Sequence, residues 1–291
     1  MLGLVNYEIE RLKYRNFWLI PGALFFSFYI FILPIPMYFI FHWLKSNFSQ
    51  IHVCVMGIII SHHITFITHS LVFYLITKLS LPFLEKYRVD NKWPYHLFKK
   101  AMQTLSWNFL IAIPIVEYFF AYVGMMQVRQ NDEIPPYTEI FWQIVFCMIT
   151  EEIWTYTFHR LLHTPMLYKY HKKHHEYTAS IGYSAEYAHI VEFIFVNIMA
   201  TGSGSMLLGN KMHSITFMLW ISYRIGDTID LHSGYDFPWI PYSVFPFATT
   251  ATYHDIHHTS NNGNYSSQFV ILDYLLGTES IKNKNVKGKN N

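Results

Sequence analysis

Long apolar runs alternate with polar segments along the chain. Three runs extend over residues 22–44, 51–79 and 105–123, and a fourth begins at Ile140 and reaches Thr150. A helix needs about 20 apolar residues to cross the hydrocarbon core of a bilayer. The pattern therefore predicts an all-α integral membrane protein with about four transmembrane helices.

Prolines, glycines and charges predict where these helices are interrupted. Pro34 and Pro36 predict a kink in the first run, because proline lacks the N–H that a helix interior needs. Residues 78–100 are polar and predict a loop or a surface helix. Residues 193–221 are apolar but broken by TGSGS and LGNK, which predicts a buried or re-entrant pair of helices.

The first 18 residues mix apolar positions with Arg11, Lys13 and Arg15. They lack the compact apolar core of a cleavable signal peptide. Their charge favours the cytosolic side of the first span. They predict either a helix at the lipid surface or a plain helical cap.

The composition agrees with a membrane protein. Hydrophobic residues make up 52% of the chain and charged residues 14%, whereas a soluble domain carries about 25% charged residues. The net charge of +2 is too small for a nucleic-acid surface, so we expect no nucleic-acid partner. Cys54 and Cys147 form no C-x-x-C pair, so any metal must be held by histidine.

Histidines are concentrated in two stretches of the second half. The triplet H-x-x-H-H occurs twice, and 17 histidines among 291 residues predict roughly 0.06 chance copies of it. Two copies therefore indicate metal ligands. The histidines of these stretches are His159, His163, His171, His174, His175, His189, His254, His257 and His258.

The spacing of these histidines suits metal binding. Positions i, i+3 and i+4 lie on one face of a helix, so each triplet can point its rings the same way. Neutral imidazole suits iron, zinc and copper. One ion takes four to six ligands, so eight or nine imidazoles predict two metals held near each other. The alternative is that these histidines are interfacial or cap helix ends.

Other histidines fall outside this pattern. His52, His62, His63 and His69 lie in the second apolar run. They could line a pathway or be satisfied by neighbouring helices, and we assign none of them as a ligand. His213 is isolated and predicted to be a packing or interfacial residue.

The predicted topology places the histidine segments on one side of the membrane. An even number of spans puts them on the same side as the N-terminus, which we expect to be the cytosol. Lys287 and Lys289 near the end of the chain are similar to the dilysine signal that retrieves membrane proteins to the endoplasmic reticulum. A solvated basic tail is the alternative.

The motifs together resemble the fatty acid hydroxylase superfamily of membrane di-iron enzymes. The likeness rests on HRLLH, HKKHH, AEYAH, DLHSGY and HDIHH, and covers about residues 140–278. The phrase HRLLHTPMLYKYHKKHHEYTASIGYSAEYAH looks most like the C-4 methylsterol oxidases. One departure is Ile190, where methylsterol oxidases often have proline. The resemblance implies three parts: transmembrane helices and loops over 1–139, a histidine-rich helical catalytic domain on the cytosolic side over 140–278, and a basic cytosolic tail over 279–291.

The resemblance also implies a chemistry. It is that of an endoplasmic reticulum enzyme with two Fe ions, which uses O2 and electrons from NAD(P)H, commonly through cytochrome b5 and its reductase. The implied reaction oxidises the 4-methyl group of a methylsterol to the carboxylate in sterol biosynthesis, alongside other sterol C-4 demethylation enzymes. Ligand positions are carried over for His159, His163, His171, His174, His175, His254, His257 and His258, and with less security for His232 and His189.

Several carboxylates and the apolar surface complete the predicted site. Side chains near the histidines could orient ligand imidazoles through their second nitrogens, although helix-capping or solvated roles are equally open. Because a sterol is mostly apolar, its pocket is predicted to lie between the helices and to open toward the membrane lipid. The candidate carboxylates are Glu151, Glu152, Asp230, Asp255 and Glu186.

Alternative functions remain open at this stage. A sterol 25-hydroxylase, a sterol desaturase or a fatty-acid or alkane hydroxylase would share the same histidine motifs. A membrane metal transporter is a different class, but transporters commonly place their ligands at the bilayer midplane on broken, repeated helices. Here the triplets lie at the ends of apolar runs and no repeated spans are evident, which favours an enzyme.

Overall fold

The computed structural model describes residues 2–89 and 94–280. Within these residues the chain forms helices joined by loops; they contain no β-strand, only three isolated bridges. The predicted all-α fold class is confirmed. The predicted retrieval lysines, Lys287 and Lys289, lie outside the described residues.

The N-terminal helices rise along one side of the molecule and return through α4. Helix α2 ends at Phe31 and α3 begins at Pro34, which starts a new helix because it has no N–H to donate. The predicted kink is thus confirmed. The elements are α1 (Leu2–Arg15), η1 (Asn16–Trp18), α2 (Leu19–Phe31), α3 (Pro34–Asn47) and α4 (Gln50–Leu79).

The next stretch is helical from residue 95 to residue 122. A π-helical turn, Asn108–Ala112, directly precedes Pro114 in the first turn of α7. Proline removes one helical hydrogen bond, and a widened turn accommodates that loss. The elements are α5 (Pro82–Glu85), η2 (Tyr95–Leu97), α6 (Phe98–Trp107), η3 (Asn108–Ala112) and α7 (Ile113–Tyr122).

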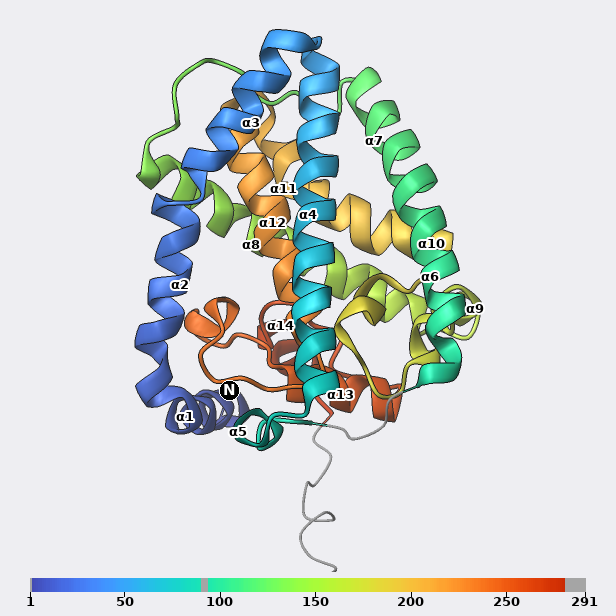
Figure 1. Ribbon diagram of the computed structural model, residues 1–291. Helices are drawn as coiled ribbons and strands as arrows, with labels where there is room; N and C mark the ends of the chain where they lie inside the picture. Colours follow the sequence, from blue (N-terminus) through green and yellow to red (C-terminus); the bar gives the residue numbers. More distant parts are fainter. Residues whose placement is uncertain (1, 90–93, 281–291) are drawn as a thin grey trace, which may run out of the picture.

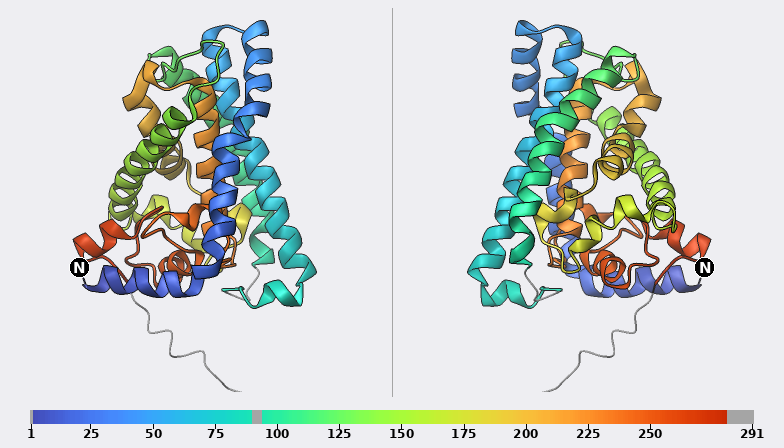
Figure 2. Two further views of the ribbon diagram at one scale, coloured as in Figure 1. Left: turned by 90° about the vertical axis from the view of Figure 1, so that its left-hand side faces the viewer. Right: turned by 90° about the vertical axis from the view of Figure 1, so that its right-hand side faces the viewer.

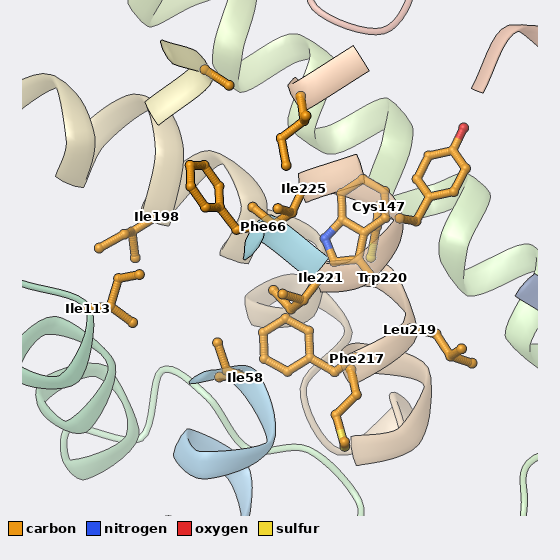
Figure 3. Packing of buried hydrophobic residues seen from close by; sticks show 14 of the residues in the cluster. Ile58, Phe66, Ile113, Cys147, Ile198, Phe217, Leu219, Trp220, Ile221 and Ile225 are labelled. Atoms are coloured by element: carbon orange, nitrogen blue, oxygen red, sulfur yellow. The ribbon is translucent and has the colours of Figure 1, made fainter. Parts of the chain in front are cut away.

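Helix α12 (Ser214–Leu231) forms the centre of the core, because every one of its residues is buried. It packs against α4, α3, α8 and α13. Figure 3 shows Trp220 of α12 beside Cys147 of α8, and Phe217 beside Ile58 of α4. A helix buried on all sides is apolar around most of its circumference; the polar residues of the second half of α12, Arg224 and Thr228 among them, line the cavity beside the histidines.

The remaining elements carry the histidines and enclose them. The helix predicted to break at TGSGS continues through that sequence and breaks only at LGNK, where Gly209 has a φ of +54°. The elements are α8 (Tyr137–Leu162), α9 (Tyr168–His171), η4 (His174–Glu176), η5 (Gly182–Glu186), α10 (Ile190–Glu192), η6 (Phe193–Ile198), α11 (Met199–Leu208), η7 (Gly209–Lys211), η8 (Pro241–Val244), α13 (Ala251–Ser260) and α14 (Ile271–Leu276).

Four helical stretches of the described chain are long and apolar enough to cross a membrane: Leu2–Asn47, Gln50–Leu79, Tyr95–Tyr122 and Ile190–Lys211. The first two contain the first two predicted runs, and the third covers the predicted run 105–123 up to Tyr122. The fourth differs from the prediction, because the run that begins at Ile140 belongs to α8. The second half of α8 is interrupted by charged and histidine side chains that face the protein interior.

The histidine-bearing elements lie toward one end of the molecule. In Figure 1, α13 and the N-terminal helix α1 lie at the lower end, while the α3–α4 turn and α7 lie at the upper end. Figure 2 shows from both sides that α1 lies across the lower end. The N-terminus and the second triplet are therefore at the same end, as the predicted topology requires.

Candidate metal centre

The structure brings nine of the ten predicted histidines together in two adjoining groups. In each group, one ring nitrogen per histidine lies within 4.8 Å of all the others. All are buried except His163, which is half-buried. The first histidine group is His159, His163, His171, His175 and His257, and the second histidine group is His174, His232, His254 and His258.

The two triplets are shared between the groups. Residues at i and i+4 of each triplet enter one group and the residue at i+3 enters the other. Thus His174 belongs to the second group, although the other two histidines of its triplet belong to the first. His257 belongs to the first group, although the other two histidines of its triplet belong to the second. The prediction that each triplet points one way is wrong. The two groups are interlocked through the backbone of both triplets.

Different elements supply the rings. His159 lies in the last turns of α8 and His163 follows its end, whereas His232 follows the end of α12. The second triplet lies on α13 as predicted. The first does not lie on a single helix, since His171 ends α9 and the 3-10 turn η4 begins at His174.

For several histidines, a backbone carbonyl defines which ring nitrogen carries the proton and which one holds a lone pair. The Nδ1 of His159 lies 2.9 Å from the carbonyl of Tyr265, and the Nδ1 of His257 lies 2.7 Å from that of Gly263. A carbonyl only accepts, so each Nδ1 must carry the proton and donate it. Each Nε2 then holds a lone pair.

Those two lone pairs face each other. The Nε2 atoms of His159 and His257 are 3.0 Å apart, although neither carries a proton to donate. Such a contact is repulsive unless a cation lies between the atoms. Two ligands at about 2.1 Å from one ion, at right angles, are about 3.0 Å apart. The first histidine group therefore fits a metal ion.

The second histidine group has the same form. The Nε2 of His232 lies 3.2 Å from that of His174 and 2.9 Å from that of His254, and the Nε2 atoms of His254 and His258 are 3.0 Å apart. The Nδ1 of His232 donates to the carbonyl of Thr228 at 2.8 Å. Its Nε2 therefore also faces the group as a lone pair.

Burial keeps these imidazoles neutral. It lowers the pKa of His163 to about 2, that of His175 to about 3 and that of His232 to about 4. Neighbouring histidines lower the pKa further in His163 and His175. Since only neutral imidazole binds a metal, the site is ready to coordinate at neutral pH.

One carboxylate at the site was missed by the sequence prediction. Glu192 of α10 is buried, and its Oε1 lies 2.9 Å from the Nδ1 of His171. A carboxylate behind a ligand imidazole orients the ring and raises its basicity. The sequence feature that could have identified Glu192 is its position as a lone acidic residue at the start of an apolar helix, three residues after His189.

The predicted carboxylates of α8 have other partners. The Oε2 of Glu152 accepts hydrogen bonds from the backbone N–H groups of residues 267–269. Glu151 accepts from the Nε of Arg224 at 2.7 Å and from the side chain of Gln268 at 2.6 Å. Glu152 thus holds the 267–269 segment against α8, and Glu151 holds Gln268 and α12. The imidazole-orienting role of these carboxylates stays a prediction.

The other predicted residues lie as follows. The side chain of Asp230 is buried, and its Oδ1 has no hydrogen-bond partner among the described residues. Asp255 is half-buried on α13, and Glu186 pairs with His62 of α4, outside both groups, at 3.0 Å. His189 is not brought into either group, because its Nδ1 accepts from the N–H of Val191 and caps α10.

The remaining histidines have local partners, which agrees with the reading that neighbouring groups satisfy them. His63 and His69 contact the carbonyls four residues before them in α4, and His52 contacts the hydroxyl of Ser49. His213 caps α12 by accepting from the N–H of Ile215.

The chain is similar to proteins of known family. The family model described as fatty acid hydroxylase matches residues 144–278. Methylsterol monooxygenase 2-2 of Arabidopsis thaliana is 33% identical over 243 residues, 81% of this chain and 90% of the relative. Methylsterol monooxygenase 1 of Danio rerio is 33% identical over 82% of each chain. A very-long-chain aldehyde decarbonylase of Oryza sativa subsp. japonica is 34% identical over 74% of this chain and 84% of the relative. No solved structure matches.

Proposed function

We propose a function from the premise that this chain belongs to the fatty acid hydroxylase family, as its motifs predicted. It is a membrane protein of a family of oxidoreductases, and its histidine cluster is compatible with a metal site. The proposed function is a di-iron monooxygenase that oxidises the C-4 methyl group of methylsterols with O2.

One observation carries the proposal of two metals. The histidines form two interlocked groups in which Nε2 lone pairs converge at about 3 Å. Single-metal sites need four to six ligands, and nine imidazoles in two groups support two ions. We propose all nine as ligands and exclude His189. The names of the plant and fish relatives support a methylsterol as the substrate.

The proposed first step is balanced as follows. A methyl C–H bond of the substrate breaks and one atom of O2 enters as the hydroxyl. The other oxygen atom takes up two electrons and two protons and leaves as water. Two further oxidations of the same kind give the aldehyde and the carboxylate. When bound, a pair of irons supplies the oxidising power for an unactivated C–H bond.

This chain's residues provide the environment for that step. Glu192 would fix the ring of His171 and raise its basicity, and the carbonyls of Tyr265, Gly263 and Thr228 would fix three further rings. The burial of the site would keep water from competing with the substrate. A small cavity beside the histidines is also lined by α12 and by Val196 and Asn197 of the membrane-spanning stretch Ile190–Lys211.

The location and the electron supply are also part of the proposal. The histidine groups lie toward the end of the molecule that carries α1, and we propose that this end and both chain ends face the cytosol at the endoplasmic reticulum. Electrons would come from NAD(P)H through cytochrome b5 and its reductase, as in the enzymes that the motifs resemble. The position of α13 beside α1 at one end supports access from that side.

The relatives from rice favour a second candidate, because their printed names assign them to aldehyde decarbonylation. The same centre would then act on a long-chain aldehyde. A metal transporter has less support, because the histidines lie toward one end of the spans.

The test is a turnover assay on the purified protein, loaded with Fe(II), in lipid nanodiscs. The expected result is O2-dependent oxidation of a 4,4-dimethylsterol, measured by mass spectrometry, with a chemical reductant as the electron source. His257→Ala should abolish it while the protein still inserts in membranes, and His189→Ala serves as the matched histidine control. Conversion of a long-chain aldehyde without sterol oxidation would instead establish the second candidate.

A further inference from the structure

Two cavities inside the helices share a lining residue. One is lined by histidines of both groups, among them His159 and His174. The other, called the apolar cavity below, lies between α4, α7, α11 and α12 and is lined mostly by apolar residues, with the paired His62 and Glu186 and also Glu117 among its polar ones. Figure 3 shows Ile113 and Ile198 facing Ile58 and Phe217 across this apolar space.

Asn197 lines both cavities. It belongs to the π-helical turn η6 (Phe193–Ile198), and it is the polar residue in the apolar sequence FIFVNIM. Within the described part of the chain, its side-chain amide makes no hydrogen bond. Its side chain is half-buried and is not among the fully buried unpaired groups, so a bound molecule can reach the amide. Moreover, π-helical turns often occur at functional sites. Both facts favour a ligand as its partner.

The chemistry of a methylsterol fits this position. Its hydroxyl is on C-3, so the carbon that bears the 4-methyl group is the next ring carbon. A hydroxyl both donates and accepts a hydrogen bond, and an amide offers one group of each kind. Binding the hydroxyl at the junction would direct the adjacent methyl group into the histidine cavity and leave the apolar rings in the other cavity.

We propose that Asn197 binds the 3-hydroxyl of the sterol and thereby selects the 4-methyl group for oxidation. This inference rests on the proposed function and adds the residue that sets its regiochemistry. The cavities have volumes of only about 60 and 30 Å³, far below the roughly 300–1,000 Å³ of ligand pockets. Sterol binding must therefore move their walls, and η6 is the segment that belongs to both.

Among the other polar groups of the apolar cavity, His62 and Glu186 pair with each other, and Glu117 offers the competing position. Glu117 of α7 is 6% exposed, and its Oε2 has no hydrogen-bond partner among the described residues. Helix α7 leads away from the histidine end (Figure 1). A hydroxyl bound by Glu117 would present the opposite end of the sterol to the metals, and side-chain hydroxylation would result. Asn197 is favoured because it also lines the histidine cavity.

The test compares two substrates in three proteins. The substrates are a 4,4-dimethylsterol and its 3-deoxy analogue, and the proteins are the wild type, Asn197→Leu and Leu207→Ala. Asn197→Leu preserves size but removes the amide, whereas Leu207 is 70% exposed on the same membrane-spanning stretch and lines neither cavity. The kcat/KM ratio of the two substrates is measured in each, because a structural defect would lower both values and leave their ratio unchanged.

The wild type and Leu207→Ala should prefer the hydroxylated sterol by about tenfold, the contribution of one hydrogen bond, and Asn197→Leu should have a ratio near one. Asn197→Leu should also form more product oxidised at other carbons. A wild-type ratio in Asn197→Leu refutes the proposal, and so does loss of the preference in Glu117→Leu alone. If the wild type converts neither sterol, the proposed function fails and this inference fails with it.

Discussion

The contact between Glu192 and His171 gives the sharpest test of the metal centre. The two side chains are 4% and 2% exposed and their atoms are 2.9 Å apart, so solvent screens the contact very little. Glu192→Gln keeps the size of the side chain and an oxygen near Nδ1, but it cannot ionise. Glu192→Leu also removes the oxygen.

The magnitude follows from the role of such carboxylates. Removing the partner of a ligand imidazole weakens metal binding about 10- to 100-fold, which corresponds to about 1.4 to 2.8 kcal/mol. We expect Glu192→Gln near the lower value, because it keeps a polar oxygen beside the Nδ1 of His171, and Glu192→Leu near the upper value. The assay is competition for Fe(II) with a chelator of known affinity, measured on purified protein.

Glu186 provides the matched control. It is equally buried and also contacts a histidine, since its Oε2 lies 3.0 Å from the Nε2 of His62, but that histidine belongs to neither group. Glu186→Gln should therefore leave metal affinity within about twofold of the wild type, a change of about 0.4 kcal/mol. Equal losses in Glu186→Gln and Glu192→Gln, or unchanged affinity in both Glu192 variants, would refute this reasoning.

Three further predictions concern the site and its scaffold. His189→Ala should retain the wild-type metal content by elemental analysis, because His189 lies outside both groups; loss of half or more of the metal would contradict that placement. Gly226→Ala should lower the melting temperature, because a Cβ there would lie 1.8 Å from the Oη of Tyr242 and overpacking costs about 1–3 kcal/mol; an unchanged melting temperature would show that Tyr242 can move. Burial raises the pKa of Glu152 from 4.5 to about 8, so the folded protein keeps a proton that the unfolded chain loses. This contribution is fully present below pH 4.5 and lost as pH rises to about 8, with a slope of about 1.4 kcal/mol per pH unit. Thermal melts from pH 5 to 8 should therefore show a smaller decline in Glu152→Gln than in the wild type, and parallel declines would contradict the assignment.

The membrane helices were largely predictable from hydropathy. Three predicted runs lie in three of the four candidate spans, and Pro34 begins a new helix where a kink was predicted. The fourth span was misplaced. Hydropathy records how apolar a segment is but not what surrounds it, and the run from Ile140 continues into a helix whose Glu151 and Glu152 are satisfied by distant segments.

The histidines of the site were predictable from motif spacing, but their division was not. The i+3 residue of each triplet crosses to the other group because elements far apart in the chain meet there, α8 and α12 among them. Sequence spacing indicates which residues share a face of one helix, but it carries no information on which distant elements pack together. Glu192 was missed for the same reason, since its partner His171 lies 21 residues earlier on another element.

The most direct measurement of the central claim is the number of metal ions per chain. Purified protein in nanodiscs would be loaded anaerobically with Fe(II), freed of excess metal and measured by elemental analysis against protein concentration. Two interlocked histidine groups predict two irons per chain in the wild type, and a clear loss of iron in both His174→Ala and His257→Ala. A wild-type value of one iron or none under saturating conditions would contradict the two-metal centre.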